Sequence, residues 1–348
     1  MYKIQTLNKI ATVGLELFPR DNYEIASEIL NPDAILVRSF NMLEMDIPAS
    51  VKGIARAGAG VNNIPLDKCS QRGIVVFNTP GANANGVKEL VIAGLLLSSR
   101  RIVHGIQWAK GLVGQGDQVP KLIEKGKSDF AGPEIKGKRL GVVGLGAIGV
   151  MVANDAVELG MKVVGYDPFI SIEAAWGLSR NVKRAKTLES LLAESDYITL
   201  HVPLNDKTRG MLGRERFAIM KKGARLLNFA RGGLVNNEDL KVALADGTVA
   251  TYVTDFPDED LLKIDNVIAF PHLGASTPEA EDNCAMMAVN QLRDFLEMGN
   301  IKNGVNFPDC ELSSIAPFRL VIANRNVPNM VGQITSILAA EKINIADM

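Results

Sequence analysis

Two chemically versatile side chains each stand directly after a short apolar run. Arg231 follows the run 225–229 beside two glycines, where its guanidinium could grip a carboxylate through two charge-assisted hydrogen bonds. His272 follows the run 267–270 and a proline, and an imidazole can exchange a proton near neutral pH. The alternatives are a surface arginine in a turn and a structural histidine. Together the two residues indicate proton transfer beside a bound carboxylate.

An acidic segment, Thr-Asp-Phe-Pro-Asp-Glu-Asp at 254–260, follows a third apolar run at 250–254. A carboxylate paired with His272 would fix the tautomer of the imidazole and stabilise its protonated form. The segment contains four acids, and local chemistry does not choose among them. A solvated acidic turn is the alternative.

The spacing of Gly144, Gly146 and Gly149 is G-x-G-x-x-G, between an apolar run at 140–143 and a helix-forming segment at 151–159. In a dinucleotide site these glycines provide a tight turn, backbone approach to a pyrophosphate and close packing of helix on strand. The following helix offers free N–H groups and a positive dipole end to the phosphates. The motif predicts nucleotide binding.

Asp167 ends the next expected strand, 162–166, where a carboxylate can accept both ribose hydroxyls. The same carboxylate would repel a 2′-phosphate, so NAD is favoured over NADP. Of the other two histidines, His201 stands at a strand end in His-Val-Pro-Leu and is expected to line the nucleotide pocket, whereas His104 lies on a polar helix face.

The loop Arg-Ala-Gly-Ala-Gly-Val-Asn-Asn at 56–63 is a further anion-binding candidate. Its backbone N–H groups could cradle an anion, with Arg38 and Arg56 near it. A glycine-rich turn without a ligand is the alternative.

The elements that must position these residues alternate between strand and helix, which predicts parallel sheets covered by helices. Expected strands lie at 34–38, 54–57, 74–77, 140–143, 162–166, 197–201, 225–229, 250–254 and 267–270. Expected helices lie at 85–110, 188–194, 238–245 and 279–299, and 111–133 is expected to be a surface loop. After a linker-like stretch, 318–323 is expected to form a strand, and a helical pattern begins at Val331.

Bulk composition narrows the function classes. A chain of 348 residues should form two or three domains. A net charge of −1 argues against nucleic acid and anionic membranes as partners, and no apolar run is long enough to span a bilayer. The N-terminus has no export signal, and the three cysteines lack metal-binding spacing. We expect a cytoplasmic protein without a metal.

Over residues 30–305, these motifs in this order resemble the D-isomer-specific 2-hydroxyacid dehydrogenases. The likeness includes Asn-Thr-Pro-Gly at 78–81, Asn-Phe-Ala-Arg-Gly-Gly at 228–233 and Pro-His-Leu-Gly-Ala-Ser-Thr at 271–277. Within the family it is strongest to the members that oxidise a phosphorylated hydroxy acid at the start of serine synthesis. The resemblance implies a catalytic set of Arg231, Glu259 and His272, in which Arg231 orients the substrate, His272 takes the hydroxyl proton and Glu259 holds His272.

The resemblance also implies the binding residues. Cofactor contacts fall on Gly144, Gly146, Ala147, Ile148, Gly149, Asp167, His201, Pro203, Thr208, Ala230, Thr254 and Gly274. Substrate contacts fall on Arg38, Arg56, Ala59 and Gly60. The family usually has Asp-Val-Phe after the third strand, with its aspartate near the nicotinamide amide. Here the order is Thr254-Asp255-Phe256, so Thr254 is assigned that place unless a bulge returns Asp255 to it.

The implied fold class is α/β, with two Rossmann-like parallel-sheet domains, the active site in the cleft between them, and a partial α+β ACT-like module. We expect a substrate-binding domain at 1–98 and 283–306, an NAD-binding domain at 99–282, a linker at 307–317 and the ACT-like part at 318–348. Serine-binding modules of this kind use polar residues in the turn where Asn326 stands, which implies L-serine as a ligand, although Asn324 replaces a common histidine. Family members pair through their nucleotide domains, which implies a homodimer or homotetramer.

Three alternatives remain beside this interpretation. A hydroxypyruvate or glyoxylate reductase would use the same machinery on an unphosphorylated acid. An NAD(H)-sensing binding protein would use the fold without turnover. A formate dehydrogenase fits the glycine loop, but that family has a glutamine where Glu259 stands.

Overall fold

The computed structural model describes residues 1–312 and 318–348, and these divide into two compact units. The first unit combines 1–83 with the described part of 278–348, and the second is the continuous segment 84–277. Each contains its own parallel sheet, so the predicted α/β class with two parallel-sheet domains is confirmed. Part of the expected linker, 313–317, lies outside the described residues.

The first unit is built on a five-stranded sheet in the order β2-β1-β3-β4-β5, with every pair parallel. Its strands are β1 (Tyr2–Leu7), β2 (Tyr23–Ala26), β3 (Ala34–Val37), β4 (Gly53–Arg56) and β5 (Val75–Phe77). Its helices are α1 (Thr12–Leu15), α2 (Leu66–Gln71), α12 (Pro278–Met298) and α13 (Met330–Ala340). The side chains of β3 alternate between two apolar clusters, one shared with α12 and the other with Cys69 of α2. Burial on both faces explains the continuous apolar runs.

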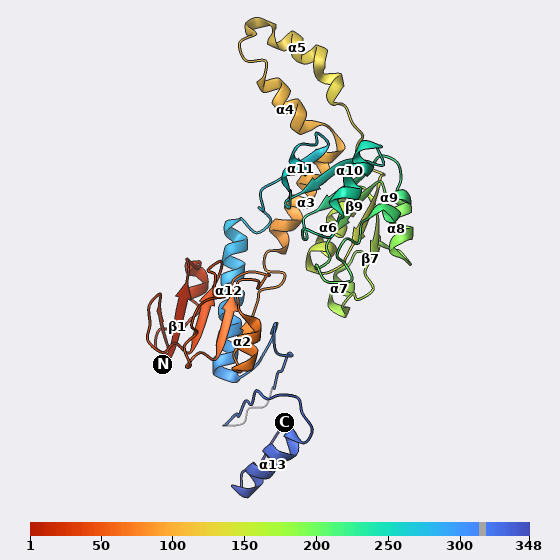
Figure 1. Cartoon of the computed structure of the whole chain (residues 1–348). Helices are drawn as coiled ribbons and strands as arrows, with labels where there is room; N and C mark the ends of the chain where they lie inside the picture. The colour runs from red at the N-terminus through yellow and green to blue at the C-terminus, as the bar shows by residue number, and fades with distance from the viewer. Residues whose placement is uncertain (313–317) are drawn as a thin grey trace. The chain divides into compact units, whose positions relative to one another are not determined.

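The helix α12 brings the late part of the chain back onto this sheet (Figure 1). Its buried face includes Cys284, Ala288 and Leu292. Gly14 of α1 lets the two helices approach closely, because a Cβ at Gly14 would stand 2.6 Å from the Cβ of Ala285. The predicted helix at 279–299 is confirmed.

The second unit contains a seven-stranded parallel sheet in the order β12-β11-β10-β9-β6-β7-β8. Its strands are β6 (Arg139–Val143), β7 (Lys162–Tyr166), β8 (Lys183–Arg184), β9 (Tyr197–Leu200), β10 (Ala224–Asn228), β11 (Val249–Thr254) and β12 (Val267–Ala269). The strand order reverses between β6 and β9. In an open α/β sheet, ligands bind outside the carboxyl ends of the strands at such a point.

Helices cover both faces of this second sheet. One face packs against α3 (Ala84–Ser99) and α6 (Ala147–Glu158). The other packs against α8 (Leu188–Glu194), α9 (Arg214–Ala218) and α10 (Asn237–Ala245). The shorter helices α7 (Ile172–Gly177) and α11 (Glu259–Leu262) follow β7 and β11.

The prediction of one helix over 85–110 was wrong, because two helices, α3 and α4 (Ile102–Lys110), occupy this region. The hydroxyls of Ser98 and Ser99 both donate to the carbonyl of Leu95, and such local bonds compete with the helical backbone ladder. The expected loop at 111–133 contains α5 (Val119–Gly126) between two short 3₁₀ turns, 116–118 and 127–130. The α4 helix is linked to the second of these turns through Trp108 and Phe130, whose ring centres lie 5.3 Å apart.

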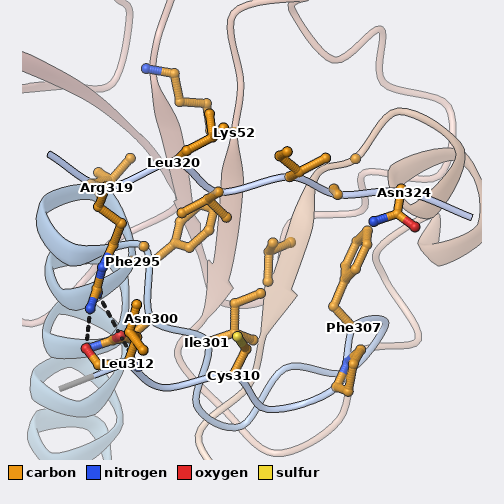
Figure 2. Close-up of a pocket in the computed structure, with 18 of the residues that line it drawn as sticks. Lys52, Phe295, Asn300, Ile301, Phe307, Cys310, Leu312, Arg319, Leu320 and Asn324 are labelled. Carbon is orange, nitrogen blue, oxygen red and sulfur yellow. Dashed lines mark hydrogen bonds between the residues drawn. The ribbon is translucent and has the colours of Figure 1, made fainter. Parts of the chain in front are cut away.

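The C-terminal part of the first unit is less regular than predicted. Residues 318–323 do not form the predicted strand, since they are not hydrogen-bonded to a neighbouring strand, and the helix α13 follows. Residues 319–324 line a cavity of about 730 Å³ together with other residues of the first unit. At this cavity Arg319 donates to Oδ1 of Asn300 at 3.0 Å (Figure 2). The ACT-like module stays a prediction.

Candidate active site

The glycine loop begins where β6 ends, at the point of strand-order reversal. Gly144 has a φ of +93°, and a Cβ there would lie 2.5 Å from the carbonyl oxygen of His201. A Cβ on Gly149 would lie 2.0 Å from the carbonyl oxygen of Gly144. Gly146 differs, because nothing lies within 4 Å of the position its Cβ would take. The first and third glycines are therefore needed for packing, and the second leaves open space.

That open space lies at the N-terminus of α6, which fits the phosphates of a dinucleotide. Gly146 is the N-cap of α6 and supplies no side-chain hydrogen bond to the first turn. The first N–H groups of a helix need acceptors, and the helix dipole favours an anion there. Ala147 and Ile148 begin the helix at this point, and Ile148 also packs on the core beneath it.

Asp167 is fixed beside the same loop. One carboxylate oxygen accepts from the backbone N–H of Leu145 at 2.8 Å, and the other accepts from that of Phe169 at 2.8 Å. Each carboxylate oxygen can accept a second hydrogen bond, so both remain able to receive ribose hydroxyls. The Asp167 carboxylate, which the sequence analysis singled out, thus offers the acceptor oxygens to which the two hydroxyls of a ribose can donate.

His201 follows β9, the strand next to β6. Its backbone N–H donates to the carbonyl of Val143 at 2.7 Å, and Nε2 lies 3.0 Å from Oγ1 of Thr199. Neighbouring atoms enclose the ring although part of the residue reaches solvent, and burial lowers the pKa of His201 to about 3. The ring is therefore neutral at physiological pH, as suits a wall of the nucleotide site.

The loop after His201 closes into a compact turn around Thr208. The Thr208 hydroxyl donates to the carbonyl of Pro203 at 2.6 Å and accepts from the backbone N–H of Asn205 at 2.9 Å. Pro203 and Thr208, both predicted cofactor contacts, are thus held in one fixed loop.

Arg231, Glu259 and His272 follow β10, β11 and β12, three strands that are neighbours in the sheet. The carboxyl ends of parallel neighbours meet at one edge, so the sheet brings these three loops together. Gly232 lies against Phe256, with 3.5 Å between the Cβ it would carry and that of the phenylalanine. Phe256 in turn meets the His272 ring edge-on, at 4.9 Å between ring centres.

The Arg231 loop is positioned by Asn228, a residue to which the sequence analysis gave no role. Its buried amide donates to the carbonyl of Arg231 at 2.9 Å, and its Oδ1 accepts from the N–H of Ala230 at 3.2 Å. Arg231 itself is exposed, with Nη1 donating to the carbonyl of Ala230 at 2.7 Å. The signal in the sequence was an asparagine at a strand end, directly before the arginine motif.

The three predicted catalytic residues differ in surroundings. His272 is exposed beside Phe256. Glu259 begins α11, its side chain is 87% exposed, and it pairs with Nζ of Lys263 at 3.1 Å. The structure therefore brings Arg231 and His272 to one sheet edge, while Glu259 faces a lysine of its own helix.

Thr254 ends β11 and Asp255 follows it directly, and both are buried. The Thr254 hydroxyl donates to the carbonyl of Asn228 at 3.0 Å and accepts from the N–H of Phe256 at 3.1 Å. Oδ1 of Asp255 has no hydrogen-bond partner. Burial raises the pKa of Asp255, against the opposing charges of His272 and Arg231. The remaining predicted cofactor residue, Gly274, is buried, and its Cβ would stand 3.0 Å from Val87 of α3.

The predicted substrate residues lie in the first unit, after β3 and β4. Nη2 of Arg38 pairs with Oε1 of Glu281 at 2.7 Å, and Nε of Arg56 donates to the carbonyl of Arg38 at 3.0 Å. Gly58 makes room for Arg56, because a Cβ there would lie 2.5 Å from Nη1. The carbonyl of Ala59 accepts from Asn78 at 2.6 Å, and Gly60 follows it in the same loop.

Metal-ligand clusters and membrane-spanning helices are both absent from the described residues. Residues 1–312 and 318–348 contain no group of three or more His, Cys, Asp or Glu side chains arranged to hold a metal ion. None of the helices in this part of the chain is long and apolar enough to cross a membrane.

Comparison with known families identifies the family of this chain. Residues 93–274 match the model of the D-isomer specific 2-hydroxyacid dehydrogenase, NAD binding domain. The chain therefore belongs to the D-isomer specific 2-hydroxyacid dehydrogenase family, and NAD is its cofactor. This confirms the family resemblance and the expected cofactor.

Curated relatives share the name D-3-phosphoglycerate dehydrogenase. The chain is 36% identical over 313 residues to that of Methanocaldococcus jannaschii, covering 86% of this chain and 57% of the relative. It is 34% identical over 342 residues to that of Bacillus subtilis, covering 92% of this chain and 62% of the relative. The chain thus spans somewhat more than half the length of these relatives.

Solved structures show the same architecture. The NAD⁺-bound 3-phosphoglycerate dehydrogenase of Entamoeba histolytica matches with a TM-score of 0.69 at 28% identity, covering 88% of this chain and 99% of that one. Holo D-mandelate dehydrogenase of Rhodotorula graminis matches with a TM-score of 0.74 at 23% identity, covering 89% of this chain and 99% of that one. The second likeness concerns the fold alone.

Proposed function

We propose that this chain catalyses the NAD-dependent oxidation of 3-phospho-D-glycerate to 3-phosphohydroxypyruvate, the reaction that opens L-serine biosynthesis. The observation that carries the proposal is the placement of Arg231 and His272 after β10 and β12, the two strands that flank β11, in the unit that contains the dinucleotide loop. Relatives named D-3-phosphoglycerate dehydrogenase, matched over most of this chain, support the choice of substrate.

Each residue of the proposed site has a separate task. Arg231 binds the substrate carboxylate through its planar guanidinium, and His272 accepts the proton of the C2 hydroxyl. NAD, when bound, supplies the acceptor for the hydride from C2. Arg38 and Arg56, with the backbone near Ala59 and Gly60, bind the anionic ends of the substrate.

Glu259 is proposed to hold the His272 imidazole in one orientation. Its carboxylate now contacts Lys263 in an exposed ion pair, and exposed pairs contribute only about 0–1 kcal/mol. Moving the Glu259 carboxylate from Lys263 to His272 therefore costs little free energy. The nicotinamide contact proposed for Thr254 would have to form through the same hydroxyl that already bonds Asn228 and Phe256.

A second candidate, a hydroxypyruvate or glyoxylate reductase, is favoured by one observation. Nη2 of Arg38 lies 2.7 Å from Oε1 of Glu281 in an ion pair. This pair neutralises one of the two guanidinium charges, those of Arg38 and Arg56, that would bind a substrate phosphate. A plain 2-keto acid needs fewer cations. An NAD(H)-sensing binding protein is the candidate from another class.

The test is NADH consumption with 3-phosphohydroxypyruvate, hydroxypyruvate and glyoxylate in parallel, with His272→Ala as the control. We expect a preference of about a hundredfold in kcat/KM for the phosphorylated acid, or 2.7 kcal/mol of transition-state binding, and loss of turnover in the variant. Equal rates on all three would select the general reductase. Tight NADH binding without turnover would select the sensor.

Three further properties belong to the proposal. We propose self-association as a homodimer or homotetramer, supported by exposed apolar side chains such as Ile106 on α4 and Val113 beyond it. We also propose L-serine as a ligand of the C-terminal part around Asn324 and Asn326. Cys69, Cys284 and Cys310 are all free thiols, which supports the cytoplasm as the compartment. Sedimentation and serine inhibition of the same assay test the first two.

A further inference from the structure

The loop after β4, residues 57–60, is held in place by the two residues that follow β5; we call it the substrate loop. The amide of Asn78 donates to the carbonyl of Ala59 at 2.6 Å. The backbone N–H of Thr79 donates to the carbonyl of Gly58 at 3.1 Å. The conformation of the substrate loop therefore depends on where residues 78 and 79 stand.

These two hydrogen bonds decide which way the N–H groups of the substrate loop face. A trans peptide places its C=O and its N–H on opposite sides. Because the carbonyls of Gly58 and Ala59 are turned toward the residues after β5, the N–H groups of Ala59 and Gly60 face away from them. The Arg56 guanidinium lies beside these groups, since a Cβ at Gly60 would stand 3.7 Å from its Nη1. Backbone N–H groups and a guanidinium together form a cradle for an anion.

Gln291 of α12 holds the residues after β5 in turn. Its Nε2 donates to the carbonyl of Asn78 at 3.0 Å, and the residue is only 9% exposed. Its Oε1, in contrast, has no hydrogen-bond partner among the described residues. A buried polar atom without a partner lowers stability, so stability alone does not account for a glutamine at this position. The hydrogen bond to Asn78 therefore points to a role in function.

The helix α12 gives this hydrogen bond a firm support. It packs closely on β4, because a Cβ at Gly53 would stand 3.1 Å from the Phe295 ring. In the first turn of the same helix, Glu281 pairs with Arg38 at 2.7 Å. One helix thus contacts both the residue that supports the substrate loop and one of the proposed substrate cations.

We propose that Gln291 is a positioning residue for substrate binding, which acts through Asn78 to keep the N–H groups of the substrate loop directed at an anionic end of the substrate. This inference rests on the proposed function. The glutamine fixes the backbone of Asn78, and the Asn78 side chain fixes the Ala59 carbonyl. Such a role affects how tightly the acid binds rather than the chemical step, so it should appear in KM and not in kcat.

The variant Gln291→Met keeps the length of the side chain and removes the donor together with the unpaired oxygen. We expect KM for 3-phosphohydroxypyruvate to rise roughly threefold to tenfold, the range of one lost hydrogen bond between neutral groups, with kcat and KM for NADH unchanged. The melting temperature should stay within about 2 °C of the parent, because the unpaired oxygen is lost as well. A lower melting temperature with an unchanged KM would assign Gln291 to stability alone and overturn the proposal.

Gln5→Met is the matched control. Nε2 of Gln5 donates to the carbonyl of Ser27 at 3.2 Å, so the same substitution removes the same kind of hydrogen bond in the same unit. This bond lies outside the proposed substrate site, and the variant should leave KM for the acid unchanged. An equal rise in KM in both variants would reflect a general loosening of the first unit and would also overturn the proposal.

Asn78→Ala tests the second step of this chain of contacts. We expect KM for the acid to rise at least as much as in Gln291→Met, since the hydrogen bond to Ala59 is removed directly. The double variant should raise KM by less than the product of the two single effects, because residues of one hydrogen-bond network are not additive. The full product would show that Gln291 does not act through Asn78.

Hydrogen exchange followed by mass spectrometry needs no turnover and separates this inference from the proposed function. Peptides that contain 57–60 and 78–79 should exchange faster in Gln291→Met than in the parent, whereas peptides from the second unit should not change. This result supports the role of Gln291 even if the parent acts on none of the tested acids, which would reject the proposed function. A parent that turns over, with exchange and KM unchanged in the variant, keeps the proposed function and overturns this inference.

Discussion

Both units place a glycine-rich loop after a buried parallel strand, yet the two loops offer different means of holding an anion. The loop after β4 wraps around the guanidinium of Arg56, which Gly58 leaves room for. The loop after β6 has no basic side chain, and its open position at Gly146 exposes backbone N–H groups of α6. Guanidinium groups bring full positive charge to a small anion, whereas backbone N–H groups and a helix dipole bind phosphate through geometry. Under the proposed function, the two loops bind two different ligands, the substrate at the loop after β4 and the dinucleotide at the loop after β6.

The largest effect is expected from a substitution in the glycine loop after β6, which binds through its backbone N–H groups in the proposed site. Gly146→Val projects two methyl groups into the open space, so we expect the dissociation constant of NADH to rise about a hundredfold, or 2.7 kcal/mol, with stability within about 0.5 kcal/mol of the parent. Gly149→Ala is the contrasting control, because its Cβ would meet the Gly144 carbonyl at 2.0 Å. That variant should lose about 1–3 kcal/mol of stability. Fluorescence titration and thermal melts check both, and equal stability losses would contradict the distinction.

The next largest effect is expected from a substitution in the loop after β4 of the first unit, where a guanidinium is proposed to bind the substrate. Arg56→Lys keeps the charge but loses the planar donors and the bond from Nε to the Arg38 carbonyl. We expect KM for the phosphorylated substrate to rise about tenfold, in line with a charge-assisted hydrogen bond of roughly 1.5–3 kcal/mol, while NADH affinity stays the same. Steady-state kinetics measure the first quantity and fluorescence titration the second. A change in NADH affinity would show that this loop is not specific to the substrate.

The smallest effect concerns an arrangement found in both units, an aspartate that accepts from a backbone N–H and from a lysine. Asp33 in the first unit accepts from the Lys3 N–H and from Lys52, both at 2.9 Å. Asp196 in the second accepts from the Arg139 N–H at 2.8 Å and from Lys221 at 2.9 Å. Burial alone would raise the pKa of either acid, but the backbone hydrogen bond and the lysine lower it.

Because the folded pKa is lowered, each carboxylate stabilises its unit above the unfolded pKa of about 4, and that stability is lost as the pH falls through the folded value. Asp33→Asn and Asp196→Asn should therefore each lose about 1 kcal/mol at pH 7 and nothing in strong acid. Denaturant unfolding at pH 7 and pH 2–3 tests this. A loss that persists in acid would show that the carboxylate charge is not its source.

Much of the fold was predictable because buried parallel strands leave a strong pattern. The strands from 34–38 to 267–270 follow from short apolar runs that end in glycine, proline or polar residues. The break between α3 and α4 was not predictable in this way, since Ser98 and Ser99 sit in an otherwise helical pattern and act through local hydrogen bonds. The strand expected at 318–323 has apolar side chains, but a strand also requires a hydrogen-bonded neighbour.

The site residues were predictable where the local geometry favours a single residue type. They were uncertain where several residues of the same chemical type lie close together in the sequence. The glycine spacing depends on close approaches and a positive φ that favour glycine, and Asp167 follows at the distance at which a ribose-binding acid is expected. The acids of 254–260 look alike in sequence, and burial distinguishes them only after β11 and α11 have formed. Asn228 was missed because its role is to hold the carbonyl of Arg231, which no side-chain pattern reveals.

The chain leaves the first unit after Asn83 and returns to it at Pro278, so the second unit is an insertion within the first. During translation the strands β1 to β5 emerge first, but the helix α12 that covers one face of their sheet emerges only after all of 84–277 has been made. At about 5–20 residues per second, that apolar face waits roughly ten to forty seconds on the ribosome. The first unit is therefore the part of the nascent chain whose apolar surface stays uncovered longest.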